Sequence, residues 1–304
     1  MGQEAGLTPS APGRVSGGAV LDLLPEIGGA VGRFTVDGID VLRPAVPGAH
    51  SPLETACFPL VPFANRIANG IFRFGGRTIT LPRNFGDHPH PLHGQGWQNP
   101  WQVLSATHDT AIFAYEHQSD SWPWAYRAEQ RFVLSSRALR IELILANCCT
   151  DAMPASVGFH PYFHRTPGAM LRTDVAGVWL SDDDGIPTVP AAPATFLDLA
   201  QGAPLRDAPF VDHNHFRWSR RAAIIQPDGC GFIELTASPA LHHLHIFLPR
   251  HSDLFCVEPV SAMPDAFNRE SARDDVHVIA PGAALSVWME IAVRTSAQKC
   301  CIWE

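Results

Sequence analysis

The sequence predicts an all-β protein, a large antiparallel β-sandwich with few short helices. Several segments alternate hydrophobic and polar residues with a period of two, which is the pattern of half-buried strands. The 27 prolines and 24 glycines are spread along the chain, and this distribution leaves little room for long helices. Many short strands joined by turns indicate a sandwich or a barrel.

The strands can be followed in chain order. The segment FRFGGRTITL (72–81) predicts a hairpin, because two alternating runs flank a Gly-Gly turn. Residues 139–145 and 285–293 alternate in the same way over longer stretches. QPDGCG (226–231) is a turn between the strands AAII and FIELTAS.

The chain is expected to form one domain over residues 1–304. Its 304 residues with 46 % hydrophobic content can bury a large core, and all-β sandwiches often exceed about 200 residues as one domain. Residues 1–18 are rich in Gly, Pro and Ser and are expected to form a flexible arm. Residues 295–304 are expected to form a tail.

Charge and cysteine content exclude several classes of function. The formal net charge is −8, and no run of Lys or Arg occurs, so nucleic acid and anionic membranes are not expected partners. Seven cysteines without a CxxC motif argue against a disulfide framework and favour a reducing compartment. Neither a signal peptide nor an apolar run of about 18 residues is found. We therefore expect a cytoplasmic monomer or homodimer.

Polar residues interrupt the strand pattern in a few motifs, which are SVGFHPYFHR (156–165), PFANRIANG (62–70), HPHPLHGQGW (88–97), FVDHNHF (210–216) and LFCVEPVSAMPDAFN (254–268). Glu258 stands out, because a carboxylate on an apolar strand costs desolvation energy unless it is paired. Glu258 and His160 each precede a proline, which holds both on extended backbone. An acid and a base that need fixed geometry would be held in this way.

Histidine pairs raise the alternative of a metal site. His88 with His90, and His213 with His215, have HxH spacing, and LHHLH (241–245) adds three more imidazoles. Such ligands suit zinc, iron or copper. However, 15 histidines in 304 residues produce pairs of this kind by chance. A cupin-like metalloenzyme stays open at this point.

Taken together, the motifs resemble the aldose 1-epimerase (galactose mutarotase) family. NRIANGIFRFGGRTITLPRN, then LHG and W, GFHPYF, VDHNHF and EPVSAMPDAFN occur in the family's order, and the likeness covers residues 20–293. The resemblance implies a supersandwich fold and the interconversion of α and β anomers of a free aldose. It also implies a monosaccharide as partner and neither a metal ion nor an organic cofactor.

The resemblance assigns a role to each site residue. Glu258 is implied as the general base at the anomeric hydroxyl, and His160 as the general acid at the ring oxygen. His93 is implied to hydrogen-bond the sugar near that oxygen. Arg66, with its neighbour Asn65, and Asp212 are implied to bind hydroxyls. We expect the nearby carboxylates to favour the imidazolium form of His160.

Two other functions remain open. The same fold can act on a sugar phosphate or a sulfosugar, for which Arg73, Arg77 and Arg83 offer positive charge. A carbohydrate-binding or regulatory module that lost catalysis is the other. The intact Glu258 and His160 pair argues against a mere binder, which has no need of both groups.

Overall fold

The computed structural model describes residues 11–227 and 229–294, and this part of the chain is nearly all β-structure. Every strand pair in it is antiparallel. The helical elements are short 3-10 segments. The expectation of an all-β antiparallel sandwich with few short helices is therefore confirmed.

The strands in chain order are β1 (Ala11–Ser16), β2 (Ala19–Leu24), β3 (Ala30–Val36), β4 (Ile39–Asp40), β5 (Cys57–Leu60), β6 (Ile71–Phe74), β7 (Arg77–Thr80), β8 (Gln102–Ala106), β9 (Thr110–His117), β10 (Tyr126–Leu134), β11 (Ala138–Asn147), β12 (Met153–Ala155), β13 (Gly158–His164), β14 (Met170–Thr173), β15 (Gly177–Ser181), β16 (Pro187–Ala191), β17 (Ala203–Pro204), β18 (Val211–Phe216), β19 (Arg221–Gln226), β20 (Gly231–Ala237), β21 (His243–Leu248), β22 (Leu254–Val260), β23 (His277–Ile279) and β24 (Ala284–Arg294). The 3-10 segments are η1 (Pro52–Glu54), η2 (Ala68–Gly70), η3 (Gly96–Gln98), η4 (Ala266–Asn268) and η5 (Glu270–Asp275).

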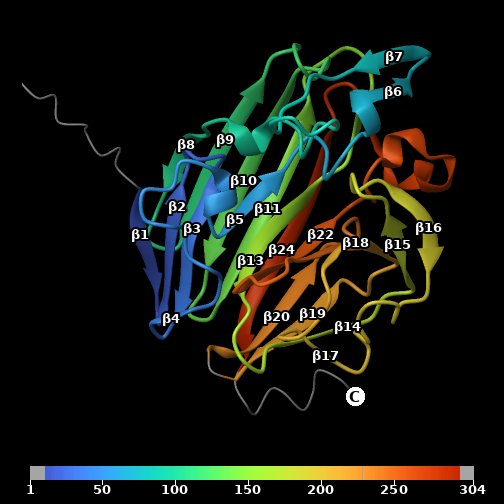
Figure 1. The fold of residues 1–304 in the computed structure, drawn as a ribbon. Coiled ribbons are helices and arrows are strands. Elements are labelled where there is room, and N and C mark those ends of the chain that lie inside the picture. The colour runs from blue at the N-terminus through green and yellow to red at the C-terminus, as the bar shows by residue number, and fades with distance from the viewer. Residues whose placement is uncertain (1–10, 228, 295–304) are drawn as a thin grey trace, which may run out of the picture.

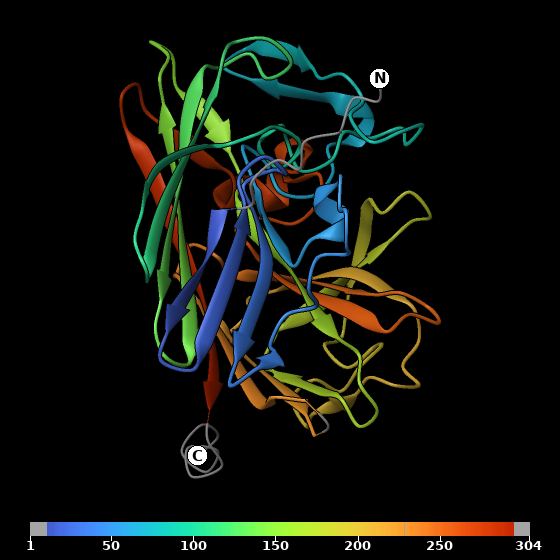
Figure 2. The same ribbon diagram turned by 90° about the vertical axis from the view of Figure 1, so that its left-hand side faces the viewer.

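Two large sheets form the sandwich (Figure 1). The first has 11 strands in the order β1-β2-β3-β5-β13-β22-β21-β18-β15-β16, with β4 added beside β3. The second has nine strands in the order β17-β14-β19-β20-β24-β11-β10-β9-β8. Figure 2 shows the two sheets as separate layers. Each sheet contains strands from both halves of the chain, with those of the first half on one side and those of the second half on the other, so neither half forms a separate layer.

The core lies between the two layers and follows the predicted alternation. In β11 the residues Leu139, Ile141, Leu143 and Leu145 are all buried, whereas the residues between them are partly exposed. Residues 72–81 form the predicted hairpin of β6 and β7. β19 pairs with β20 on either side of the predicted turn. Hydrophobic burial of one face per strand is the dominant stabilising term here.

The expected flexible arm over residues 1–18 is too long. Residues 11–16 form β1, in which Arg14 and Val15 pair with Leu21 and Val20 of β2. Backbone hydrogen bonds to a neighbouring strand order this segment despite its Gly and Pro content. The rest of the expected arm (1–10) and the tail (295–304) lie outside the described residues, and the single domain stays a prediction.

Among residues 11–227 and 229–294, no helix has both the length and the apolar character needed to span a membrane. The cytoplasmic location stays a prediction.

Substitution of Phe132 tests how much the inter-sheet core contributes to stability at a position outside the polar motifs. Its buried ring packs against Phe113, with ring centroids 5.1 Å apart. We expect Phe132→Ala to lower the free energy of unfolding by about 3–5 kcal/mol, because the lost side chain leaves a cavity. The exposed neighbour Val133 is the matched control, and Val133→Ala should cost less than about 1 kcal/mol. Urea unfolding measures both, and equal losses would contradict this assignment of the core.

Candidate active site

Five adjacent strands of the 11-stranded sheet place polar and aromatic side chains next to one another. The strand order is β5, β13, β22, β21 and β18. In this order they carry Phe58, His160, Glu258, His245 and Asp212. His160 lies opposite Phe58 in the register, and His245 lies opposite Glu258. Residues that are far apart in the sequence therefore meet at the centre of one sheet.

Strand alternation separates this site from the inter-sheet core. Phe159 and Val257 directly precede His160 and Glu258, and both belong to the main hydrophobic core. Successive side chains of a strand point to opposite faces of the sheet. Since Phe159 and Val257 face the other sheet, His160 and Glu258 face away from it. The prolines that follow each of them leave both strands extended, as expected.

His160 and Glu258 form a buried pair. Nε2 of His160 lies 3.3 Å from Oε1 of Glu258. The His160 ring stacks on Phe58, with centroids 4.5 Å apart. Both side chains are almost fully buried, and Oε2 of Glu258 has no hydrogen-bond partner in the described part of the chain. A buried carboxylate oxygen without a partner is costly and is available to a ligand.

Burial decides the protonation of this pair, and the expected imidazolium at His160 is wrong. Burial, assisted by the charge of His245, lowers the pKa of His160 from 6.5 to about 3. Burial and the charge of Asp212 raise the pKa of Glu258 well above its usual 4.5. Desolvation penalises every charged form, so it outweighs the attraction that favoured imidazolium. Both shifts favour a neutral imidazole and a protonated carboxyl group over the ion pair.

His93 and Asn65 fix each other. The backbone N–H of Asn65 donates to Nδ1 of His93 at 3.0 Å, and the N–H of His93 donates to the Asn65 carbonyl at 2.9 Å. Both residues have left-handed backbone, with φ of 59°, a conformation that clusters at functional sites. Because Nδ1 accepts, the neutral His93 ring carries its proton on Nε2. Burial, together with the neighbouring imidazole of His160, lowers the pKa of His93 well below 6.5, so His93 is a neutral donor.

Arg66 and Asp212 form the polar end of the site. Nη2 of Arg66 lies 3.4 Å from Oδ2 of Asp212, and Nη1 of Arg66 donates to Oδ1 of Asn65 at 3.1 Å. Gly185, with φ of 78°, packs so closely on this side chain that an added Cβ would lie 2.7 Å from Cζ of Arg66. The guanidinium is therefore held in one position.

His245 belongs to the site, although the sequence did not assign it. Its Nε2 donates to Oδ1 of Asp212 at 2.7 Å, and its Nδ1 lies 3.3 Å from Nδ2 of Asn65. Burial raises the pKa of Asp212. The hydrogen bond from His245 and the charge of Arg66 lower it by more, so this pKa stays below its usual range. A signal in the sequence could have found His245. It lies between Leu244 and Ile246, which are buried in the core, so strand alternation points its side chain to the other face of the sheet, where the site lies.

The other motif histidines are placed elsewhere. Nδ1 of His90 accepts from the N–H of Asn69 at 3.0 Å, and Nδ1 of His88 accepts from the N–H of His90 at 3.2 Å. His213 lies beside Ser181, with Nδ1 and Oγ 3.3 Å apart. Neither HxH pair is among the groups of potential metal ligands in the described residues. Two other groups are, namely His160 with Cys256 and Glu258, and His242 with His243 and Asp275.

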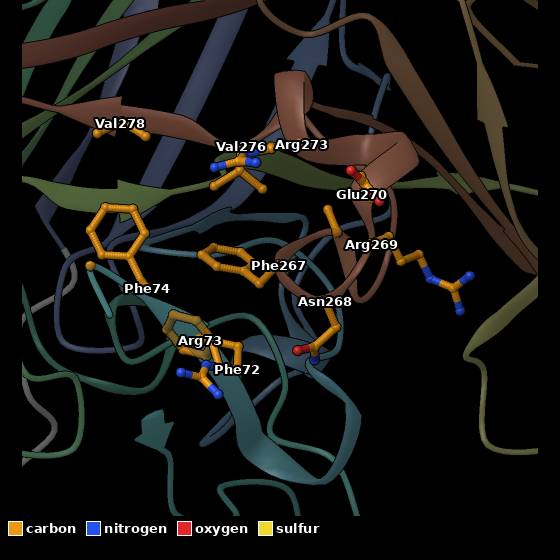
Figure 3. Close-up of a pocket in the computed structure, with 12 residues that line it drawn as sticks. Phe72, Arg73, Phe74, Phe267, Asn268, Arg269, Glu270, Arg273, Val276 and Val278 are labelled. Carbon is orange, nitrogen blue, oxygen red and sulfur yellow. The ribbon is translucent and has the colours of Figure 1, made fainter. Parts of the chain in front are cut away.

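A cavity of about 510 Å³ lies beside the hairpin β6–β7 and the segments η4 and η5. The rings of Phe72, Phe74 and Phe267 gather around it, and the guanidinium of Arg269 points away from them (Figure 3). Arg73 also lines it. Neither His160 nor Glu258 does, so this cavity is separate from the buried pair.

The comparison with known proteins decides the family. The family model of aldose 1-epimerase matches residues 16–292. The chain belongs to the aldose 1-epimerase family. It is 33 % identical over 281 residues to YphB, an uncharacterized protein of Escherichia coli (strain K12), a match that covers 88 % of this chain and 93 % of YphB.

Solved structures agree with the galactose mutarotase-like fold. A crystal structure of a candidate aldose 1-epimerase from Escherichia coli K12 superimposes with a TM-score of 0.85 at 30 % identity, covering 93 % of this chain and 98 % of that one. A galactose mutarotase-like protein from Clostridium acetobutylicum gives 0.83 at 19 % identity, covering 93 % and 94 %. At that identity the second likeness concerns the fold alone.

Substitution of Asp212 tests its contacts with Arg66 and His245. In Asp212→Asn, one oxygen acceptor becomes a donor, so Arg66 or His245 loses its acceptor. We expect the free energy of unfolding to fall by about 1–3 kcal/mol, as for hydrogen bonds to charged groups. Asp87→Asn, at an exposed loop position, is the control and should stay within about 0.5 kcal/mol. Chemical unfolding of both variants provides the measurement, and an unchanged Asp212→Asn would argue against these contacts.

Proposed function

We propose that this protein is an aldose 1-epimerase that interconverts the α and β anomers of a free monosaccharide. The buried His160–Glu258 pair carries the proposal. Mutarotation removes a proton from the anomeric hydroxyl O1 and adds one to the ring oxygen O5, so it needs a base and an acid together. O1 and O5 are bonded to the same carbon, C1. A base and an acid that serve them must therefore lie close together, and the 3.3 Å separation of Nε2 and Oε1 suits this requirement.

The pair holds the proton that the reaction needs. A neutral pair and a carboxylate–imidazolium pair contain the same single proton, so they differ only in its position. In the carboxylate–imidazolium form, Glu258 accepts the proton of O1 while His160 donates to O5, and the C1–O5 bond opens. After rotation about C1–C2, the ring closes on the other face and both transfers reverse. No proton is gained or lost overall.

The remaining residues support binding of the sugar. Nε2–H of neutral His93 is a donor that faces the His160 ring at right angles, with centroids 5.5 Å apart, and can donate to an oxygen near O5. Arg66, Asn65 and Asp212 offer donors and acceptors for hydroxyl groups. No metal ion or organic cofactor has a step in this mechanism.

The charges favour a neutral sugar over the alternative of a sugar phosphate or a sulfosugar. Arg66 is already paired with Asp212, and an anion here would face this carboxylate. Of the arginines expected to attract an anion, Arg77 lies over the ring of Trp124 and beside Asp151. Arg73 lines the separate cavity. In the described part of the chain, neither Arg73 nor Arg77 forms a hydrogen bond or an ion pair with His160 or Glu258. Arg43 lies over the ring of Tyr162, and its Nη2 donates to backbone carbonyls, so Arg43 is the further cation that a charged sugar could use.

Anomer exchange measured by NMR tests the proposal. Equilibrated glucose, galactose, xylose and arabinose are compared with and without the protein, and exchange above the uncatalysed rate is expected for at least one. Glu258→Gln keeps the shape of the side chain but cannot accept the proton, so kcat should fall by at least about a hundredfold. The control Glu116→Gln alters an exposed strand glutamate and should retain the full rate.

Two outcomes would overturn parts of this assignment. Full activity of Glu258→Gln would remove Glu258 from the role of base. No exchange on any of the four sugars would contradict action on these free aldoses, and glucose 6-phosphate would then test the alternative substrate class.

The pH dependence of kcat/KM tests the protonation state of the pair. The active pair holds one proton, and a second proton must enter His160, whose pKa is lowered to about 3. As pH falls, activity should therefore persist, and kcat/KM at about pH 5 should keep at least about half its value at pH 7. Steady-state rates corrected for the uncatalysed reaction give the profile. An acid limb near 6.5, the ordinary value for histidine, would contradict a buried neutral His160.

A further inference from the structure

A second cluster of titratable side chains lies where the start of β21 meets the end of η5. Nε2 of His242 lies 2.8 Å from Oδ1 of Asp275, and Nε2 of His243 lies 3.0 Å from Oδ2 of the same carboxylate. The three potential ligand atoms lie within 4.8 Å of one another. None of these residues takes part in the proposed sugar chemistry.

The far side of each imidazole ring is also held. Nδ1 of His242 lies 3.1 Å from the carbonyl oxygen of Ala240, and Nδ1 of His243 lies 2.8 Å from Oδ1 of Asn214. The Ala240 carbonyl is an acceptor, so Nδ1 of His242 donates to it, and Oδ1 of Asn214 can accept from Nδ1 of His243 in the same way. Each ring then directs its Nε2 at Asp275. Histidines that bind metal ions are oriented in this way, by a carbonyl or amide oxygen on the other ring nitrogen.

Both Nε2 atoms face the same carboxylate, and the two imidazole rings lie with centroids 4.7 Å apart. A single divalent cation satisfies both Nε2 atoms and Asp275 at once. We propose that His242, His243 and Asp275 bind one divalent transition-metal ion of the zinc class.

The dimensions and the surroundings fit such an ion. With bonds of about 2.0–2.2 Å to nitrogen and oxygen, tetrahedral ligand atoms lie roughly 3.3–3.5 Å apart, so a small opening of the cluster is sufficient. His243 is buried, whereas the side chains of His242 and Asp275 are 32 % and 21 % exposed, which leaves access for the ion and for a water ligand. Nearby in the chain, Nε2 of His277 is buried without a hydrogen-bond partner. Imidazole and carboxylate ligands together suit zinc.

An ion here would fasten η5 to the sheet. The segment η4–η5 is the red-orange coil at the right edge of Figure 1. Asp265, just before it, donates its N–H to the Arg66 carbonyl at 2.7 Å, and its Oδ1 accepts from the N–H of Ala68 at 2.9 Å. The site would therefore brace the segment that supports the position of Arg66. Its role is structural, and the ion takes no part in the proton transfers of the proposed epimerase activity.

Metal titration of the purified full chain tests the site. After treatment with a chelator and its removal, Zn²⁺ is added and bound metal is counted by mass spectrometry, and Co²⁺ is added in parallel to record its visible absorption. We expect one ion per chain and a cobalt band that shows nitrogen and oxygen ligands. His242→Gln and Asp275→Asn should each weaken binding by at least about tenfold. Circular dichroism checks that these variants fold.

Controls separate this site from other ligands in the chain. His108→Gln removes an exposed surface histidine and should leave binding unchanged. Cys256→Ser disrupts the second potential group at His160 and Glu258, and a double substitution of Cys300 and Cys301 by serine removes the two thiols near the end of the sequence. Both should keep one ion per chain. Zinc should also raise the melting temperature of the wild type but not of Asp275→Asn.

Several outcomes would overturn the proposal. One is the absence of stoichiometric binding with both Zn²⁺ and Co²⁺, which would leave a protonated histidine pair as the explanation. Others are binding that survives His242→Gln and Asp275→Asn unchanged, or binding lost in Cys256→Ser. Anomer exchange is measured separately, so failure of the metal site and failure of the proposed function are distinguishable.

Discussion

The alternation of side chains across the central strands of the 11-stranded sheet is the constraint on which the site depends. In β13, β22 and β21, hydrophobic residues such as Phe159, Val257 and Leu244 belong to the inter-sheet core, and their neighbours face the other way. A register slip of one residue would exchange the two faces. It would bury His160 and Glu258 between the sheets, so the energy of the core also fixes the polar site.

Burial of the site has an electrostatic consequence. His160 and Glu258 lie among aromatic rings and close to a second carboxylate, so the charged forms of both are penalised. One proton shared by two groups can serve the proposed epimerisation, in which one proton is added to the sugar and one is removed. At the other end, Asp212 keeps its charge because Arg66 and His245 contact it. Environment alone gives two carboxylates different protonation.

Segments that are distant in the chain support Arg66 from several sides. Asn65 holds its guanidinium, Gly185 packs against it, and Asp265 bonds its backbone. The segment that follows Asp265 ends at Asp275, where it meets His242 and His243. The position of Arg66, in the first quarter of the chain, therefore depends on contacts made near the end of the chain.

The sequence alone determined the fold class, the strands with clear alternation, and six residues that the structure brings together: Asn65, Arg66, His93, His160, Asp212 and Glu258. Local periodicity sufficed for the strands, and alternation and proline placement singled out His160 and Glu258, whereas the resemblance to the aldose 1-epimerase family implied Asn65, Arg66, His93 and Asp212. Tertiary structure decided the rest. His245 entered the site through pairing with β22 and β18, residues 11–16 joined a sheet through β2, and His242 and His243 met Asp275 across the fold. The protonation of His160 also required the structure, since desolvation depends on the surrounding atoms and not on the neighbours in sequence.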